Sequence, residues 1–314
     1  MDCKTSLPLY SIIIPVLNEE GNVELISKKI IGALGKDANY EIIFIDDGST
    51  DNTLLNIKQL HKNNPLIKYI SLSRNFGHQS ALRVGFDYAK GDCVISLDGD
   101  MQHPPELIPE MIEKWGGDGY DIVYTIRKED KSLSIFKRTS SRLFYRILNY
   151  FADITLEPGS ADFRLLDRNV VDSIRHFQEP TLFFRGIIPW LGFKQYAIEY
   201  TPQERFSGTS KYSFRKMFQF ALSGILSFSV KPLFISVYSG VIISFLAFCY
   251  GIYAAIKKIF FNTTIEGWAS TIAVISFIGG LQLISLGIIG IYLGKLFMDN
   301  KRRPPYIIRE KSND

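Results

Sequence analysis

Short apolar runs alternate with longer amphipathic stretches through the first hundred residues of the chain. The apolar runs predict strands over residues 10–14, 40–45 and 67–72, and a fourth strand that begins near Asp92. The stretches between them predict helices entered between Asn18 and Asn22, from about Thr50, and over residues 78–89. Strands that alternate with helices in this way are typical of a parallel α/β sheet.

Polar residues follow each of these strands. In chain order they are Asn18, Glu19 and Glu20, then Asp46 and Asp47, then Arg74 and Asn75, and finally Asp98 and Asp100. Because ligands of open parallel sheets bind beyond the carboxyl ends of the strands, we expect these side chains to line one crevice. Such a set suits a ligand that carries phosphate together with a metal ion. The chain has no GxGxxG after the first strand and no GxxxxGK[ST], so it carries neither a dinucleotide fingerprint nor a P-loop.

Two acids separated by one glycine, Asp98 and Asp100, end the fourth strand and are followed by Gln102. Buried carboxylates are unfavourable unless they are paired or bound to a cation, and two so close together repel each other. A divalent metal would resolve both problems, since hard oxygen ligands suit Mg²⁺ or Mn²⁺. Taken alone, the segment also fits a strand that is followed by a solvated turn.

The pattern is less regular beyond residue 110. Residues 120–128 predict a strand that ends at Arg127, and a basic helix is expected over about 134–150. This helix carries three arginines that are four positions apart, Arg138, Arg142 and Arg146. Its basic face is either solvated or lines an anion site. Asp162 falls in a small-residue turn just before an apolar strand, which is an unusual place for an acid without a function.

Two long stretches near the C-terminus contain no charged residue, residues 233–256 and residues 267–294. Each exceeds the roughly 20 apolar residues that a bilayer-spanning helix needs. The short connection over 257–266 would make them a transmembrane hairpin; the alternative is a pair of buried core helices.

Charge is divided unevenly along the chain, although the net value is only +4. The first 204 residues carry 23 basic and 28 acidic residues, whereas residues 205–231 carry basic residues and no acid. Basic residues thus flank the apolar hairpin on the side of the globular part, as the positive-inside rule requires of a cytoplasmic side. A mildly acidic globular part argues against nucleic acid as a partner. No signal peptide is recognisable, and three scattered cysteines suggest a reducing compartment.

A basic amphipathic stretch over residues 211–231 precedes the first apolar span. Such a helix is typical of one that lies in the membrane interface. Its charge would either attract anionic lipid head groups in general or, with Arg205, Ser210 and Lys211, bind one lipid phosphate and bring it to the crevice.

Six segments in a fixed order resemble the family 2 glycosyltransferases of GT-A fold. They are IIIPVLNEEGNV, IDDGSTDNT, SRNFGHQSAL, LDGDMQHPPE, DFRLLDR and RFSGTSKYSF. The resemblance covers nearly the whole chain and is strongest to the polyprenyl-phosphate glycosyltransferases, which include bactoprenol glucosyltransferases and dolichol-phosphate mannose synthases. The chain has Asp-Gly-Asp where the family more often has Asp-Ala-Asp, and it keeps both acids.

The resemblance implies roles for the matching positions. The nucleotide-sugar would be bound by Pro15, Asn18, Glu19, Asp46, Asp47 and Asp98. The metal, Mg²⁺ or Mn²⁺, would be held on the diphosphate by Asp98, Asp100 and Gln102. The acceptor phosphate would be contacted by Arg127, Arg138, Arg205, Ser210 and Lys211. Asp162 and Asp100 would be the catalytic acids, with Asp162 near the reacting sugar.

The expected protein is therefore an integral membrane enzyme of the bacterial inner or plasma membrane, with the catalytic domain and both termini in the cytoplasm. Its expected parts are a GT-A domain (1–210), an amphipathic helix (211–231), a transmembrane hairpin (232–296) and a basic tail (297–314). It would move a hexose, glucose from UDP-glucose, to polyprenyl phosphate for a cell-envelope polysaccharide, by one inverting displacement. Other sugars, including mannose from GDP-mannose, stay open, as do a homo-oligomer and a non-catalytic membrane scaffold of this fold. A chain-extending polysaccharide synthase is disfavoured because its Gln-x-x-Arg-Trp element is absent.

Overall fold

The computed structural model describes most of the chain. The described residues are 7–35, 37–128, 149, 157, 159–179, 182–201, 229–261 and 267–313. They divide into two compact units. The first comprises residues 1–149, 154–219 and 303–314, and the second comprises residues 150–153 and 220–302.

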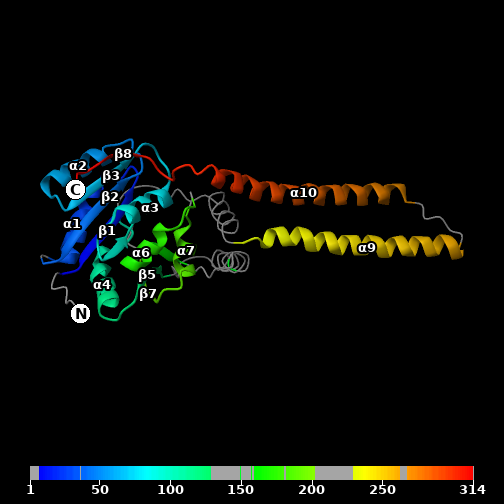
Figure 1. Cartoon of the computed structure of the whole chain (residues 1–314), viewed down its shortest axis with the longest axis horizontal. Helices are drawn as coiled ribbons and strands as arrows, with labels where there is room; N and C mark the ends of the chain where they lie inside the picture. The colour runs from blue at the N-terminus through cyan, green and yellow to red at the C-terminus, as the bar shows by residue number, and fades with distance from the viewer. Residues whose placement is uncertain are drawn as a thin grey trace. The chain divides into compact units, whose positions relative to one another are not determined.

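An eight-stranded sheet forms the first unit, in the order β7-β5-β6-β4-β1-β2-β3-β8 (Figure 1). The strands are β1 (Leu9–Val16), β2 (Asn39–Asp46), β3 (Ile67–Leu72), β4 (Cys93–Ser96), β5 (Ile122–Arg127), β6 (Ser160–Asp167), β7 (Gln195–Tyr200) and β8 (Ile308–Lys311). Strands β3, β2, β1 and β4 are neighbours and run parallel. The predicted α/β class and the first four predicted strands are confirmed.

Helices cover both faces of this sheet. They are α1 (Val23–Leu34), α2 (Thr53–Asn63), α3 (His78–Tyr88), α4 (Ile108–Gly116), α6 (Arg168–Arg175) and α7 (Phe184–Trp190), with a 3-10 turn over Pro105–Leu107. Alternation within β1 assigns the faces: Ile12 and Ile14 join the core that contains residues of α1 and α4. Ile13 points the other way, toward Gly85 of α3, where an added Cβ would lie 2.7 Å from its Cδ1. Burial on both faces explains why the strand is apolar throughout.

The other half of the sheet departs from the expected parallel arrangement. Strand β6 pairs antiparallel with both β4 and β5. Asp162 lies within β6 and is buried, so the expectation of a turn at this position was wrong. The physical reason is alternation: Phe163 and Leu165 enter one core, while Asp162 and Arg164 point to the opposite face of the strand.

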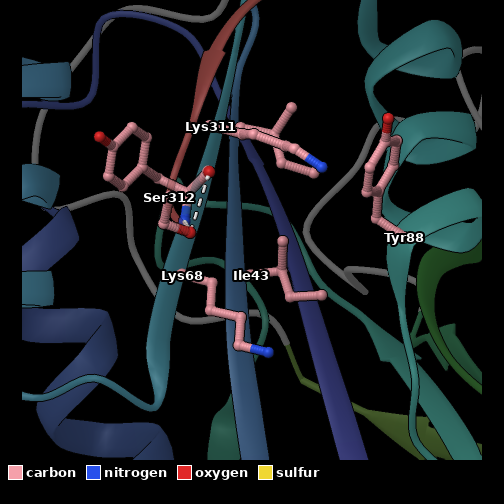
Figure 2. Close-up of a pocket in the computed structure, with 7 residues that line it drawn as sticks. Ile43, Lys68, Tyr88, Lys311 and Ser312 are labelled. Carbon is pink, nitrogen blue, oxygen red and sulfur yellow. Dashed lines mark hydrogen bonds between the residues drawn. The ribbon is translucent and has the colours of Figure 1, made fainter. Parts of the chain in front are cut away.

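The chain returns to this sheet after its second apolar helix. Strand β8 pairs antiparallel with β3, so part of the expected basic tail is an edge strand of the catalytic unit. The Tyr306 hydroxyl donates a hydrogen bond of 2.8 Å to Asp87 of α3, and Lys58 of α2 forms an ion pair of 2.7 Å with Glu310. Figure 2 shows Lys311 and Ser312 beside the sheet, around a small hollow that Tyr88 of α3 also lines.

Two long apolar helices, α9 (Lys231–Phe261) and α10 (Trp268–Asn300), make up the described part of the second unit. They extend beyond the expected spans. The segments Leu233–Tyr253 and Val274–Asn300 have mean hydropathies of 2.0 and 2.2 and are long and apolar enough to cross a membrane. None of either segment is buried inside the protein, which does not fit the alternative of buried core helices.

Candidate active site

The carboxyl ends of β1 and β2 are joined by hydrogen bonds to acid and amide side chains. Asp46, at the end of β2, is 1% exposed and accepts from the Ser71 hydroxyl at 2.8 Å and from the Ser49 N–H at 3.0 Å. Asn18, just after β1, accepts from the Thr50 N–H at 2.8 Å. The loops after the two strands are thereby fixed against each other, as expected for one shared crevice.

Asp47 connects β2 to the loop that follows β3. Its carboxylate accepts the N–H groups of Phe76 and Gly77, at 2.7 and 2.9 Å. Burial raises the pKa of Asp47 above its usual value, although these two N–H groups and His78 act in the opposite direction. The carboxylate therefore orders the Phe76–Gly77 backbone at the rim of the crevice.

A pocket of about 190 Å³ lies between these loops. It is lined by Pro15, Val16, Leu17, Asp47, Asn75, Gly77, His78 and Ala81. Two residues of the expected nucleotide-sugar set, Pro15 and Asp47, are among them. Three others, Asn18, Glu19 and Asp46, are not in this lining; they form hydrogen bonds that hold the loops after β1 and β2.

The Asp98–Gln102 turn follows β4 directly. Met101 is buried with φ 65°, a left-handed backbone that is rare for a residue with a side chain. The Gln102 N–H donates to Asp100 at 3.1 Å, and an added Cβ at Gly99 would lie 2.7 Å from a Val16 methyl. The turn that carries both carboxylates is thus closely packed and has a strained backbone, a feature that often occurs at functional sites.

The donors of this turn fit a hard divalent cation. Asp98, Asp100 and Gln102 offer carboxylate and amide oxygens, and the Asp98 side chain is 34% exposed. Among the described residues, no group of three or more His, Cys, Asp or Glu side chains could hold a metal ion without other ligands. A partial set of this kind suits Mg²⁺ or Mn²⁺, whose coordination is commonly completed by substrate phosphate and water.

Asp162 is the most strongly compensated acid of the site. Arg185 of α7 binds it with a two-point fork, Nε to Oδ1 at 3.0 Å and Nη2 to Oδ2 at 2.8 Å. Arg164 lies 3.7 Å from Oδ1, and His78 Nε2 lies 3.4 Å from Oδ2. Burial acts to raise the pKa of Asp162, but Arg185 and His78 outweigh it and hold that pKa well below the usual value.

His78 joins the two acidic groups of the site. Its Nε2 lies 3.4 Å from Asp98 Oδ1 as well as from Asp162. The His78 side chain is 40% exposed, so it is only partly desolvated. Desolvation acts to lower its pKa, but Asp162 and Asp98 raise that pKa to about 9. The structure therefore brings together Asp98 and Asp162, which are 64 positions apart in the chain.

Several residues of this cluster were not predicted from the sequence. His78 begins a helix shortly after a strand that ends in polar residues, and this position could have identified it as a candidate site residue. Arg185 and Tyr200 gave no local signal, because both reach the site from distant elements. Burial raises the pKa of Tyr200 to about 12. The charges of Arg127, Asp98, Asp100 and Arg185 also act on this pKa, so the Tyr200 hydroxyl belongs to the same cluster.

Arg127 is the one expected acceptor-phosphate residue that falls within the described parts of the chain. It is exposed at the end of β5, and its N–H donates to the Gly159 carbonyl at the start of β6. The other expected residues, Arg138, Arg205, Ser210 and Lys211, lie outside the described residues, as does most of the expected amphipathic helix.

The sequence and the fold match known proteins over most of the chain. Residues 11–175 match Glycosyl transferase family 2. A prophage bactoprenol glucosyl transferase homolog of Escherichia coli (strain K12) is 38% identical over 95% of this chain and 98% of its own. The bactoprenol glucosyl transferase of Shigella phage SfV is 38% identical over 96% and 98%. The glycosyltransferase YkcC of Bacillus subtilis (strain 168) is 40% identical over 96% and 93%.

Among solved structures, a mannosyltransferase from Pyrobaculum calidifontis, in complex with GDP-Man and Mn²⁺, has a TM-score of 0.50. It is 16% identical over 71% of this chain and 64% of its own, and this likeness supports the GT-A-like fold. The family match and the fold together define the class of the protein as a glycosyltransferase of GT-A-like fold. This chain belongs to glycosyltransferase family 2. The expected fold and enzyme class are thus confirmed.

Replacing Gly48 with alanine tests the close approach of the β2 and β3 loops. Gly48 has φ +74°, and an added Cβ would lie 2.6 Å from the Arg74 carbonyl carbon. We expect Gly48→Ala to lower the unfolding free energy by about 2 kcal/mol or more and to weaken nucleotide binding, because the backbone must shift.

Gly119→Ala is the matched control, because Gly119 has φ +65° but nothing within 4 Å of an added Cβ. Thermal unfolding and titration calorimetry with UDP and Mg²⁺ measure both effects. Equal losses in the two variants would show that only backbone strain matters and that the loops are not closely packed.

Proposed function

We propose that this chain is a membrane-bound inverting glycosyltransferase that moves glucose from UDP-glucose to polyprenyl phosphate. The observation that carries the proposal is near full-length similarity to relatives named bactoprenol glucosyl transferase. The similarity spans the apolar helices as well as the sheet. Another sugar nucleotide, such as GDP-mannose, is the alternative donor.

The donor would lie along the carboxyl edge of β1, β2 and β4. Pro15 and Asp47 line the pocket there, and Asn18, Glu19 and Asp46 support its loops. We assign base and ribose recognition to this group. Asp98, whose Oδ1 lies 3.4 Å from His78 Nε2, would stand between this group and the reacting sugar.

Asp98, Asp100 and Gln102 would hold Mg²⁺ or Mn²⁺. When bound, the cation supplies positive charge to the diphosphate that leaves. The protein's own contribution would be the strained turn at Met101, which would hold the two carboxylates in place for the cation.

The transfer itself would be one displacement at the anomeric carbon. The bond from that carbon to the diphosphate oxygen breaks as a bond to an acceptor phosphate oxygen forms, so the configuration inverts. A phosphate monoester has its second pKa near 6 and is already ionised at neutral pH. Asp162, whose pKa is held low by Arg185 and His78, is a poor proton acceptor and is not needed as one.

The acceptor phosphate would be bound by basic residues near the end of β5 and in the segment before α9. We assign Arg127 to it, together with Arg138, Arg205, Ser210 and Lys211. The basic amphipathic segment 211–231 would lie in the membrane interface and present the lipid phosphate to the domain that contains residues 1–210.

The pairing of β8 with β3 supports a hairpin topology. Strands β1 to β7, which precede α9, and strand β8, which follows α10, belong to one sheet. The chain must therefore be on the same side of a membrane before α9 and after α10. Two crossings satisfy this condition and a single crossing does not. We place the catalytic domain and both termini in the cytoplasm, in keeping with the basic residues that flank the hairpin. A homo-oligomer remains a proposal, which a molecular mass in nanodiscs tests.

A transfer assay is the decisive test of the function. Purified full-length protein would be incubated in detergent with Mg²⁺ or Mn²⁺, undecaprenyl phosphate and a panel of labelled UDP- and GDP-sugars. We expect a glycolipid of inverted configuration from UDP-glucose, with loss of at least 100-fold in Asp100→Ala and on addition of EDTA, because charge on the leaving diphosphate is no longer neutralised.

Asp37→Ala, at an exposed turn after α1, is the control and should keep full activity. If glycolipid formed only from GDP-mannose, the transferred sugar would be mannose and the assignment of UDP-glucose as the donor would be wrong. Absence of glycolipid with every donor would refute transfer to polyprenyl phosphate.

The pH dependence of transfer tests whether a base is required. We expect kcat/KM for the acceptor to be flat from about pH 7 to 8 and to fall about tenfold per unit below pH ~6, where the acceptor phosphate takes up a proton. The low pKa of Asp162 predicts no separate decrease from this carboxylate in the same range. Steady-state rates across pH would contradict this account if they rose continuously from pH 6 to 8.

Topology is tested by reporters of known sidedness. A reporter in the connection between α9 and α10 should be accessible from the opposite face to one at the C-terminus, because the hairpin crosses twice. Accessibility of both from the same face would show that α9 and α10 do not cross as a pair.

A further inference from the structure

The acid at the centre of the site is less accessible than the cations around it. The Asp162 side chain is 5% exposed, whereas those of Arg185 and His78 are 29% and 40% exposed. A group that exchanges a proton with a substrate must come within hydrogen-bond reach of it. Arg185 and His78 are therefore better placed than Asp162 to meet a molecule in the crevice.

The two cations share Asp162 but differ in their other neighbours. His78 lies 3.4 Å from Asp98, so its place is beside the metal-binding turn. Arg185 binds Asp162 by its fork, and its charge, like that of Arg127, acts on the Tyr200 hydroxyl.

The fork to Asp162 fixes the plane of the Arg185 guanidinium. Nε and Nη2 both bind the buried carboxylate, at 3.0 and 2.8 Å, so the group cannot rotate without breaking two charge-assisted bonds. A guanidinium carries five N–H donors, and a fixed, partly exposed one is suited to phosphate oxygens, which it recognises by geometry as well as charge.

We propose that Arg185 binds a phosphate oxyanion of a substrate in the crevice and that Asp162 is the positioning residue that holds it for this purpose. The proposal rests on the transfer function in that the phosphate belongs either to the lipid monoester or to the nucleoside diphosphate. It gives Asp162 a reason to be buried and ionised without acting as a base.

Equilibrium binding tests the proposal without relying on turnover. Full-length Arg185→Gln and Arg185→Lys would be compared with wild type in detergent, with Arg309→Gln of β8 as the matched control, since Arg309 is exposed on the edge strand. The probes are UDP with Mg²⁺ in one arm and farnesyl phosphate in the other. Farnesol, which lacks the phosphate, measures binding of the chain alone.

We expect Arg185→Gln to weaken one of the two phosphate probes at least tenfold and to leave farnesol unchanged. Loss confined to farnesyl phosphate assigns Arg185 to the acceptor, and loss confined to UDP assigns it to the donor. Arg185→Lys keeps the charge but not the fork, so its loss should be intermediate. Unchanged binding of both probes in Arg185→Gln, with a folded protein by thermal unfolding, would overturn the proposal.

Asp162→Asn tests the positioning role separately. It should weaken the same probe as Arg185→Gln, by a smaller factor, because the guanidinium remains but is less firmly held. Unchanged binding of that probe, together with loss of kcat alone, would show that Asp162 acts directly in the chemical step and would overturn its assignment as a positioning residue. A wild type that makes no glycolipid would refute the transfer function, while both binding arms would still report on Arg185.

Discussion

The parallel pairing of β1 with β2 on one side and β4 on the other is the constraint on which the site depends. In this register Val16 stands opposite Asp46, so β1 and β2 end together. Strand β4 ends at Ser96, opposite Ile13, and the turn that follows it reaches the end of β1, where Gly99 packs against Val16. The apolar residues of β1 are buried on both faces of the sheet. A shift of β1 against its neighbouring strands would expose these residues or bury polar ones, so the register is fixed. Packing of the core therefore brings the acids that follow the strands close together, and neighbouring groups must compensate their negative charge.

Three buried acids are compensated in three ways. Asp46 accepts from a serine hydroxyl and a backbone N–H, Asp47 accepts two backbone N–H groups, and Asp162 pairs with arginine. Asp46 and Asp47 hold loops in place, and their negative charge is compensated only by the dipoles of hydroxyl and backbone N–H groups. The third is met by full charges, which makes its neighbours, and not the acid itself, the positive surface that a phosphate encounters.

Local patterns were enough to predict the first four strands, the helices between them and the strand-end acids, because each depends on neighbours within about ten residues. The orientation of β6 and the place of Asp162 inside it were not predictable, since the same SADFRLLD alternation fits either a turn or a strand until the pairing with β4 is known. Arg185 gave no signal for the same reason: its partner is 23 positions away and on another element. The strand β8 was read as a tail because four residues of modest hydrophobicity acquire strand structure only against the free edge of β3.

The position of β8 also determines when the domain can be complete during synthesis. The sheet edge formed by β3 is made early, but β8, the strand that covers it, follows both apolar helices in the chain. Both helices must therefore be synthesised before that edge is paired. Until then β3 presents unpaired N–H and C=O groups, the kind of edge that joins other strands. Insertion of the helices and protection of the nascent domain from aggregation are thus coupled in time by a segment of four residues.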